Sequence, residues 1–260
     1  MRLGRAAAAV VVVALCGARA GAQGVSTAEV RQAVFPRLHG ADLGVRDEEN
    51  RPLFLASFDW ARWPKGPAGT YVALAVATTE RGVGPGGGCD RQRAAVPGGV
   101  LLAVVRREKV RVKRRLVTKL RMVGHDSRLV TLGCADGVAT ESITLDAGGH
   151  RLSDAEQGVV VRRRTASATG RTEEVLLYRF TTEVRLVLET EVPVGEPKAA
   201  FEPARSKSKG FFDWVRRVAP RPLPRRAPPA TQPVSPPATQ PTWPEKTVFR
   251  WSGTRYVPGR

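Results

Sequence analysis

A proline-rich tract near the carboxyl end limits what this chain can fold into more than any other segment. Ten of the 25 residues from 220 to 244 are proline, and the hexapeptide Pro-Pro-Ala-Thr-Gln-Pro occurs twice, at 228–233 and 236–241. Proline lacks a backbone N–H and fixes φ, so the tract cannot join a helix or an inner strand and favours solvated polyproline II. We expect a semi-rigid arm between a globular region and a short tail.

The first 22 residues have the pattern of a secretory signal peptide. Two arginines precede a ten-residue apolar stretch (6–15), and small residues around Ala20 offer cleavage sites. This stretch is too short to span a bilayer, which takes about 20 residues. A lipoprotein signal would need a small residue before Cys16, where the chain has Leu15, so that alternative ranks second. We predict a soluble mature protein, secreted or periplasmic, with no transmembrane segment.

Two cysteines, Cys89 and Cys134, remain after removal of the signal peptide. In an oxidising compartment two thiols most simply form a disulfide. Closing a loop of about 46 residues would stabilise the fold by roughly 4 kcal/mol through lost chain entropy. The alternative is a pair of unpaired buried thiols. Because none of the three histidines has ligand spacing with either cysteine, we predict no zinc site, and no other metal or cofactor.

Residues 25–195 are predicted to form one β-rich globular domain. A capping box at Ser26 and Glu29 predicts a short helix over 27–35, ended by Pro36. Segments rich in β-branched and aromatic residues then recur between turn residues. The predicted strands are 53–60, 70–78, 100–106, 110–117, 128–132, 142–145, 159–164, 175–180 and 184–192, with a hairpin connection at 107–109.

Strands at this spacing predict a mostly β fold, which is a sandwich, a barrel or a bent antiparallel sheet with one short N-terminal helix. Residues 196–245 are predicted as a linker, first charged and then proline-rich and disordered. Within it the aromatic segment 211–215 is interpreted as a short turn resting on the domain, or alternatively as an interfacial membrane foot. Residues 246–260 are predicted to form a C-terminal β-hairpin. Because a lone hairpin is only marginally stable, it must dock on its own domain or on a partner.

The net charge of +18 favours anionic partners, although a coding bias toward arginine is an alternative explanation. Nine basic residues and one acidic residue lie between 101 and 123. Alternate residues of a strand share a face about 6.6–6.8 Å apart, which would suit an anionic envelope polymer or an acidic lipid surface. The tentative anion-binding residues are Arg107, Lys109, Arg111, Lys113 and Arg115, with Arg162, Arg163 and Arg164 as an extension.

Two other interpretations of this basic segment stay open. It is an ordinary solvated face or an edge strand protected by its charges, or residues 109–123 form a cationic amphipathic helix with Val112, Leu116 and Leu120 on one side. Nucleic acid is a weaker ligand, because no aromatic side chain alternates with the cations to stack on bases.

No catalytic motif has the context that its chemistry needs. The G-x-G-x-x-G at 82–87 contains Pro85 and precedes no helical pattern, so it predicts a loop rather than a phosphate site. The adjacent residues His125, Asp126 and Ser127 predict a polar turn, since triad members converge from separate elements. The acidic residues at 42–49 predict a solvated surface.

The sequence therefore predicts an exported, non-catalytic protein of the cell envelope or secreted fraction that binds anionic polymers. The alternative is an interaction or scaffold protein in which the proline-rich arm and the aromatic tail reach a protein partner. An exported hydrolase ranks third.

Overall fold

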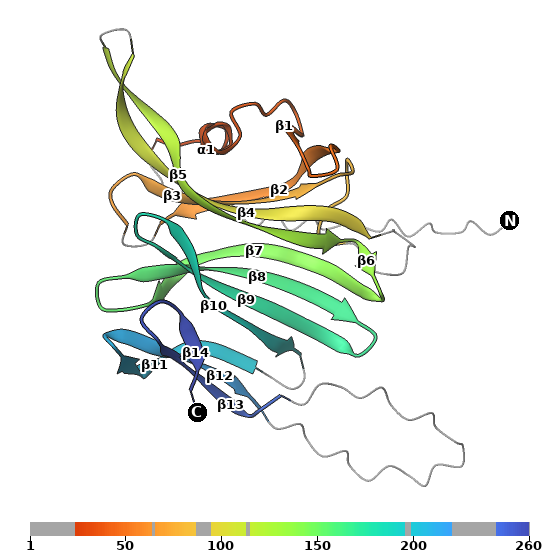
Figure 1. Cartoon of the computed structure of the whole chain (residues 1–260), viewed down its shortest axis with the longest axis vertical. Helices are drawn as coiled ribbons and strands as arrows, with labels where there is room; N and C mark the ends of the chain where they lie inside the picture. The colour runs from red at the N-terminus through yellow and green to blue at the C-terminus, as the bar shows by residue number, and fades with distance from the viewer. Residues whose placement is uncertain are drawn as a thin grey trace, which may run out of the picture.

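The computed structural model describes residues 24–63, 66–86, 95–112, 115–195, 199–219 and 243–259, and it is almost entirely β (Figure 1). The predicted fold class, mostly β with one short N-terminal helix, is confirmed. The predicted signal peptide, Cys89, Lys113 and most of the proline-rich tract lie outside the described residues. The predictions made for them, including the disulfide between Cys89 and Cys134, stay predictions.

Fourteen strands and one helix make up the described residues. In chain order they are α1 (Thr27–Val34), β1 (Asp42–Arg46), β2 (Pro52–Arg62), β3 (Thr70–Thr78), β4 (Val96–Val112), β5 (Arg115–Leu132), β6 (Cys134–Ala135), β7 (Val138–Arg151), β8 (Gln157–Ser167), β9 (Gly170–Phe180), β10 (Val184–Val194), β11 (Ala199–Ser208), β12 (Phe211–Val218), β13 (Lys246–Trp251) and β14 (Tyr256–Pro258).

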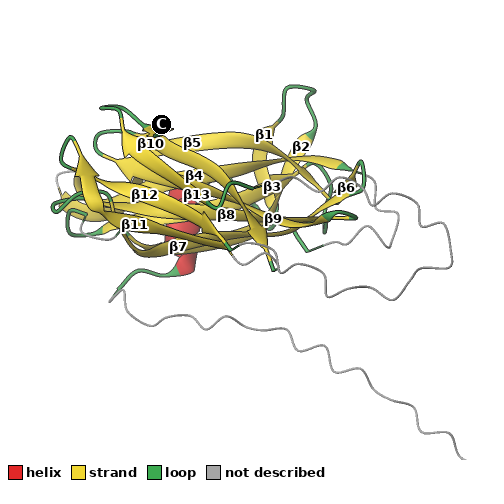
Figure 2. Ribbon diagram, turned by 90° about the horizontal axis from the view of Figure 1, so that it is seen from below, coloured by secondary structure: helices red, strands yellow, loops and turns green. Residues whose placement is uncertain are grey.

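The strands form three antiparallel sheets, each a meander of sequential neighbours: a first sheet (β1–β5), a middle sheet (β6–β10) and a last sheet (β11–β14). Figure 1 shows the three sheets stacked on one another, with α1 outside the first sheet. Seen from below, most strands run in roughly one direction and α1 crosses them (Figure 2). This is the aligned packing typical of β-sandwiches, here with a third sheet added.

The centre of the middle sheet is buried on both faces, which explains the continuous apolar runs at 159–161 in β8 and 175–178 in β9. On β8, Val159 and Val161 pack against the first sheet, whereas Val160 packs against the last sheet. In the same way β3 lies between the middle sheet and α1. Its small residue Ala73, together with Ala103, lies beneath Val30 of the helix. A strand with two covered faces needs apolar residues at every position.

The helix α1 begins where the capping box predicted. Ser26 Oγ accepts a hydrogen bond from the Glu29 backbone N–H at 3.2 Å, and the Glu29 carboxylate accepts one from the Ser26 backbone N–H at 2.7 Å. The bond from the Ser26 backbone N–H to the carboxylate, and a second from the Ser26 hydroxyl, hold the pKa of Glu29 below its ordinary value. The cap satisfies backbone donors that the first helical turn leaves free.

The predicted connection at 107–109 is wrong, because β4 runs through it to Val112. Val112 at the end of β4 instead pairs with Arg115 at the start of β5. The segment 107–109 contains no glycine, proline, asparagine or aspartate to favour a turn, and its alternation of side chains continues. The helical alternative for 109–123 is also wrong, since all its described residues are in strands.

The predicted linker at 196–245 is wrong in its first half. Residues 199–208 and 211–218 form the strands β11 and β12, joined at Lys209 and Gly210, which both have positive φ. The aromatic segment 211–215 is neither a turn nor a membrane foot, because Trp214 is 1% exposed in the core between the middle and last sheets. The strand β12 pairs with β11 on one side and with β13 on the other, which stabilises it in this position.

The C-terminal hairpin, β13 and β14, is confirmed, and it docks on its own chain by pairing β13 with β12. Phe249, Trp251 and Tyr256 are each only 5% exposed and share a core with Trp214. The Val218 backbone N–H donates to the Glu245 carbonyl at 2.9 Å. The chain therefore leaves the last sheet at the end of β12 and re-enters it at β13, on neighbouring strands.

Candidate functional site

The strands β4 and β5 extend beyond the rest of the first sheet as a two-stranded ribbon. Pairing of β3 with β4 ends at Thr70 and Arg106, whereas pairing of β4 with β5 continues to Val112 and Arg115. At about 3.4 Å per residue, the part of β4 after Arg106 projects roughly 20 Å. We call residues 106–121 the basic ribbon. Figure 1 shows it rising above the stacked sheets.

The cations of the basic ribbon lie on both of its faces, so the predicted single row of five is wrong. Residues opposite each other in an antiparallel pair share a face. Lys109 lies opposite Thr118, and Arg111 opposite Leu116, on the face that carries α1. Arg115 lies opposite Val112, which puts it on the other face, because the chain reverses before it. Lys113 lies outside the described residues.

Two further cations, Lys119 and Arg121, join Arg115 on that second face, opposite Glu108 and Arg106. The sequence prediction missed them as site residues, although the alternation of basic residues continues in β5. Their membership could be assigned only once the strand pairing was known.

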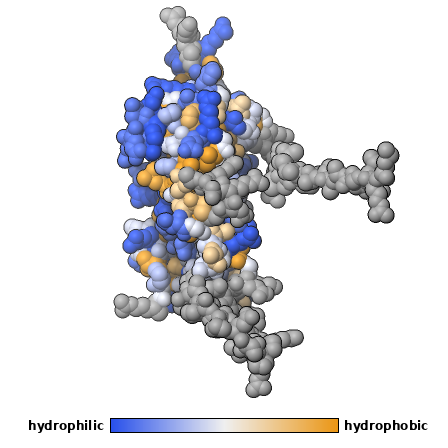
Figure 3. Space-filling model, turned by 90° about the vertical axis from the view of Figure 1, so that its right-hand side faces the viewer, coloured by the Kyte–Doolittle hydropathy of each residue, from blue (hydrophilic) through white to orange (hydrophobic). Residues whose placement is uncertain are grey.

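The cations of the ribbon differ in whether their side chains have a hydrogen-bond or ion-pair partner. The Arg107 guanidinium donates to the Gly24 carbonyl at 2.5 Å, which ties it to the segment before α1. Five other cations are exposed and have no side-chain hydrogen bond or ion pair within the described residues. They are Lys109, Arg111, Arg115, Lys119 and Arg121. In the space-filling view the projecting end is mostly hydrophilic (Figure 3).

The three arginines at 162–164 do not extend this surface, contrary to the sequence prediction. Arg163 pairs with Glu174 at 2.8 Å. Arg162 and Arg164 both pair with Glu173, at 2.8 and 2.9 Å. The neighbouring strand β9 places its two glutamates opposite β8, so the charges of this run are neutralised within the sheet.

His125, Asp126 and Ser127 lie in the middle of β5 and not in the polar turn that we predicted. Successive side chains of a strand point to opposite faces. Asp126 therefore faces the middle sheet, where it lies 4.0 Å from Arg128, while His125 and Ser127 are exposed on the other face. This arrangement excludes a hydrolase triad formed by these three neighbours.

A polar cluster between the first and middle sheets was not found from the sequence. Arg128 pairs with Glu189 at 3.1 Å, and desolvation, opposed by the charge of Arg163, holds the pKa of Glu174 above its ordinary value. Burial, followed by the charge of Asp126, raises the pKa of Tyr178. The acids of this cluster lie opposite arginines of other strands, so the cluster links β5, an edge strand of the first sheet, to β10, an edge strand of the middle sheet.

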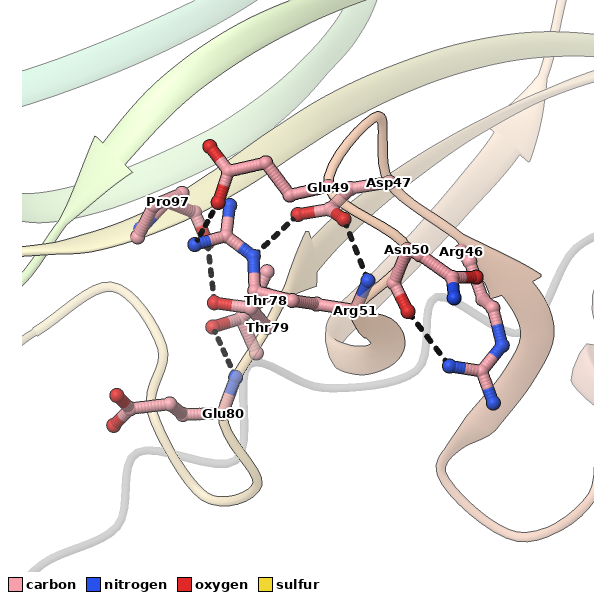
Figure 4. A network of polar contacts seen from close by, with 9 residues as sticks. All are labelled: Arg46, Asp47, Glu49, Asn50, Arg51, Thr78, Thr79, Glu80 and Pro97. Atoms are coloured by element: carbon pink, nitrogen blue, oxygen red, sulfur yellow. Dashed lines mark hydrogen bonds and ion pairs between the residues drawn. The ribbon is translucent and has the colours of Figure 1, made fainter.

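The acidic run near β1 is a surface network and not a catalytic pair (Figure 4). Asp47 and Glu49 both bind the Arg51 guanidinium, at 2.7 and 2.8 Å. Although desolvation opposes it, hydrogen bonding from Arg51 lowers the pKa of Asp47. A depression of about 620 Å³ lies nearby, lined by Arg37, Asp42 and β1 residues. It is on the edge of the first sheet opposite to β5 and gathers no acid–base pair.

Other chemistry finds no support in the part of the chain that the structure describes. There, no cluster of histidine, cysteine, aspartate and glutamate side chains could hold a metal ion. No described helix has the length and apolar character to cross a membrane. Gly82 and Gly84 lie in a loop after β3, where no helix begins to bind a phosphate.

No protein-family model matches the chain, and neither a curated protein nor a solved structure matches it significantly. The functional argument is therefore carried by the geometry of the basic ribbon.

Proposed function

We propose that this protein is exported and non-catalytic, and that it binds anionic polymers or surfaces through the basic ribbon. Export is supported by the composition of the first 22 residues, and binding by the charge of the ribbon. The single observation that carries the proposal is the contrast between two sets of arginines and lysines. Those of β8 are paired with glutamates inside the fold, whereas five of those on the ribbon are exposed and unpaired among the described residues.

An unpaired cation is available to an anionic ligand without breaking an internal ion pair. Each contact with a polyanion releases condensed counterions, which makes binding favourable and dependent on salt. The ribbon is already ordered by its own backbone ladder, so binding does not have to order it. Because the cations lie on both faces, the ribbon presents charge to a ligand from either side.

The alternative, a scaffold that reaches its partner with the aromatic tail, has less support. Phe249, Trp251 and Tyr256 would have to leave the core to contact another protein. The tail does not lie at the free end of an arm, since Val218 and Glu245 are hydrogen-bonded neighbours.

The test is a charge-neutralised ribbon variant with a matched control. The ribbon variant changes four of the five unpaired cations to glutamine: Lys109, Arg111, Arg115 and Lys119. The control variant changes four exposed cations of the last sheet and its hairpin loop to glutamine: Arg205, Lys246, Arg250 and Arg255. Binding of fluorescent heparin, a sulfated polysaccharide, is measured over a range of salt concentrations.

We expect the ribbon variant to bind heparin at least tenfold more weakly. The slope of log K against the logarithm of the salt concentration should decrease in magnitude by up to about four. The control, with the same change of net charge, should keep most of the affinity and slope. Equal losses in the two variants would show that net charge alone drives binding, and the proposal would then be wrong.

A further inference from the structure

We infer that the anionic surface recognised by the basic ribbon is an acidic lipid bilayer, and that the tip of the ribbon enters its headgroup region. This inference rests on the proposed function and names the class of ligand. It starts from two apolar side chains beside the turn of the ribbon: Leu116 is 71% exposed and Val117 is 39% exposed. A bulky apolar side chain this exposed at the end of a charged projection has no packing role in the fold.

The tip combines two kinds of side chain that a bilayer interface accepts together. Leu116 lies on the face of Arg111, and Val117 on the face of Val110 and Lys119. From residue 109 to 123 the chain has no aspartate or glutamate to repel lipid phosphates. Cations beside apolar groups bind where anionic headgroups meet acyl chains. A sulfated or phosphorylated polymer offers the anions but no apolar layer, so it would leave Leu116 in water.

The reach of the ribbon fits this placement. Apolar faces of interfacial segments are buried by about 5–10 Å, and the ribbon projects roughly 20 Å beyond β3. The tip can therefore enter the interface while the stacked sheets stay in water. The pairing of β4 with β5 satisfies the inward-facing backbone groups of the ribbon, and hydrated headgroups can satisfy the outward-facing ones.

A second exposed leucine on the same strand provides the control. Leu129 is 89% exposed, more than Leu116, but it lies beside Gly99 in the body of the first sheet and far from the tip. If exposed apolar surface by itself caused membrane binding, replacing either leucine would weaken it. If the tip inserts, only the replacement at the tip should do so.

The experiment compares binding of the full mature chain to sedimented vesicles of phosphatidylcholine with and without phosphatidylglycerol. The tip variant is Leu116→Thr with Val117→Thr, since the β-branched threonine is favourable in strands at both positions. The control is Leu129→Thr, and heparin binding is measured in parallel. A Leu116→Trp variant reports insertion through the wavelength of its added fluorescence, relative to the unsubstituted protein.

We expect the tip variant to bind acidic vesicles about tenfold more weakly while its heparin affinity is unchanged. Leu129→Thr should bind vesicles as the unsubstituted protein does, and the Leu116→Trp emission should shift to shorter wavelength on acidic vesicles only.

Unchanged vesicle binding by the tip variant, or an unshifted emission, would overturn the inference. So would a protein that binds heparin but not acidic vesicles, and the proposed function would then stand with a polymer as its ligand. If the four-cation ribbon variant keeps its heparin affinity, the proposed function itself fails.

Discussion

Two adjacent glycines in β4 show how single residues fix the close packing of strands within the first sheet. A Cβ at Gly98 would lie 2.6 Å from the Ala77 carbonyl oxygen and 3.0 Å from Leu132 Cδ1. A Cβ at Gly99 would meet only the Arg128 carbonyl oxygen, at 3.6 Å. We predict that Gly98→Ala lowers the free energy of unfolding by about 1–3 kcal/mol through overpacking. Gly99→Ala should be neutral or slightly stabilising, because alanine restricts the unfolded chain.

Urea unfolding followed by far-ultraviolet circular dichroism measures both variants. Because the two residues are neighbours on one strand, they share the same loss of chain flexibility. Equal stabilities would contradict the close contact of Gly98 with the backbone of β3.

At the scale of elements, the proline-rich arm is a long connection within one hairpin. Val218 and Glu245 are hydrogen-bonded, so an Asn-Gly turn in place of residues 219–244 would join β12 to β13 directly. Closing a long loop costs about 0.6 kcal/mol for each doubling of its length. We predict that the shortened protein folds and that its free energy of unfolding rises by up to about 2 kcal/mol. The replacement also removes Trp243, so the cation–π contact of Arg216 with that ring is lost and the gain is smaller by its contribution.

Thermal unfolding and heparin binding test this replacement together. Heparin affinity should be unchanged, since the basic ribbon lies on a different sheet. A shortened chain that fails to fold would show that the arm contributes to the structure, and a loss of heparin binding would assign the arm a role in recognition.

At the scale of the whole molecule, the last sheet depends on the final residues of the chain. Deleting 246–260 removes three aromatic residues from the core that the middle and last sheets share, and leaves Trp214 without their cover. Losing one buried aromatic side chain costs about 3–5 kcal/mol, so three such losses are comparable with the whole stability of a domain. We predict that the last sheet unfolds while the first and middle sheets stay paired.

Hydrogen exchange followed by mass spectrometry can locate the loss. Protection should disappear in β11 and β12 and persist in β3, whose residues pack in the separate core between the first and middle sheets. Unchanged protection in β12 would mean that the last sheet is stable without the C-terminal hairpin. Uniform loss in every strand would mean that the three layers fold as one unit.

Much of the fold could be predicted because its signals are local. The strand β3 has the predicted bounds, 70–78, since its buried residues are bordered by Gly69 and the polar segment after Thr78. The helix α1 begins at its capping box, and the C-terminal hairpin forms around Ser252 and Gly253 as the turn residues indicate. Each of these depends on residues close together in the chain.

The parts that could not be predicted depend on partners far away in the chain. The charged sequence of β11 and β12 carries no clear alternation, and these strands are stabilised by β13 from beyond the proline-rich arm. Residues 113 and 114, between β4 and β5, are both basic, and no residue typical of turns marks this position in the sequence. The cations that were expected on one face therefore lie on two, with Lys109 and Arg111 on one and Arg115 on the other.

The sequence by itself determined that the chain is β-rich, that its charge is concentrated between 106 and 121, and that a proline-rich segment interrupts its end. The tertiary structure alone decided which cations are neutralised. Arg162 and Lys109 both carry a positive charge, but β9 brings a glutamate to the first, and no described acidic side chain lies against the second. The charge of a residue is set by its own side chain, whereas whether that charge is free to bind a ligand depends on the side chains of the neighbouring strand.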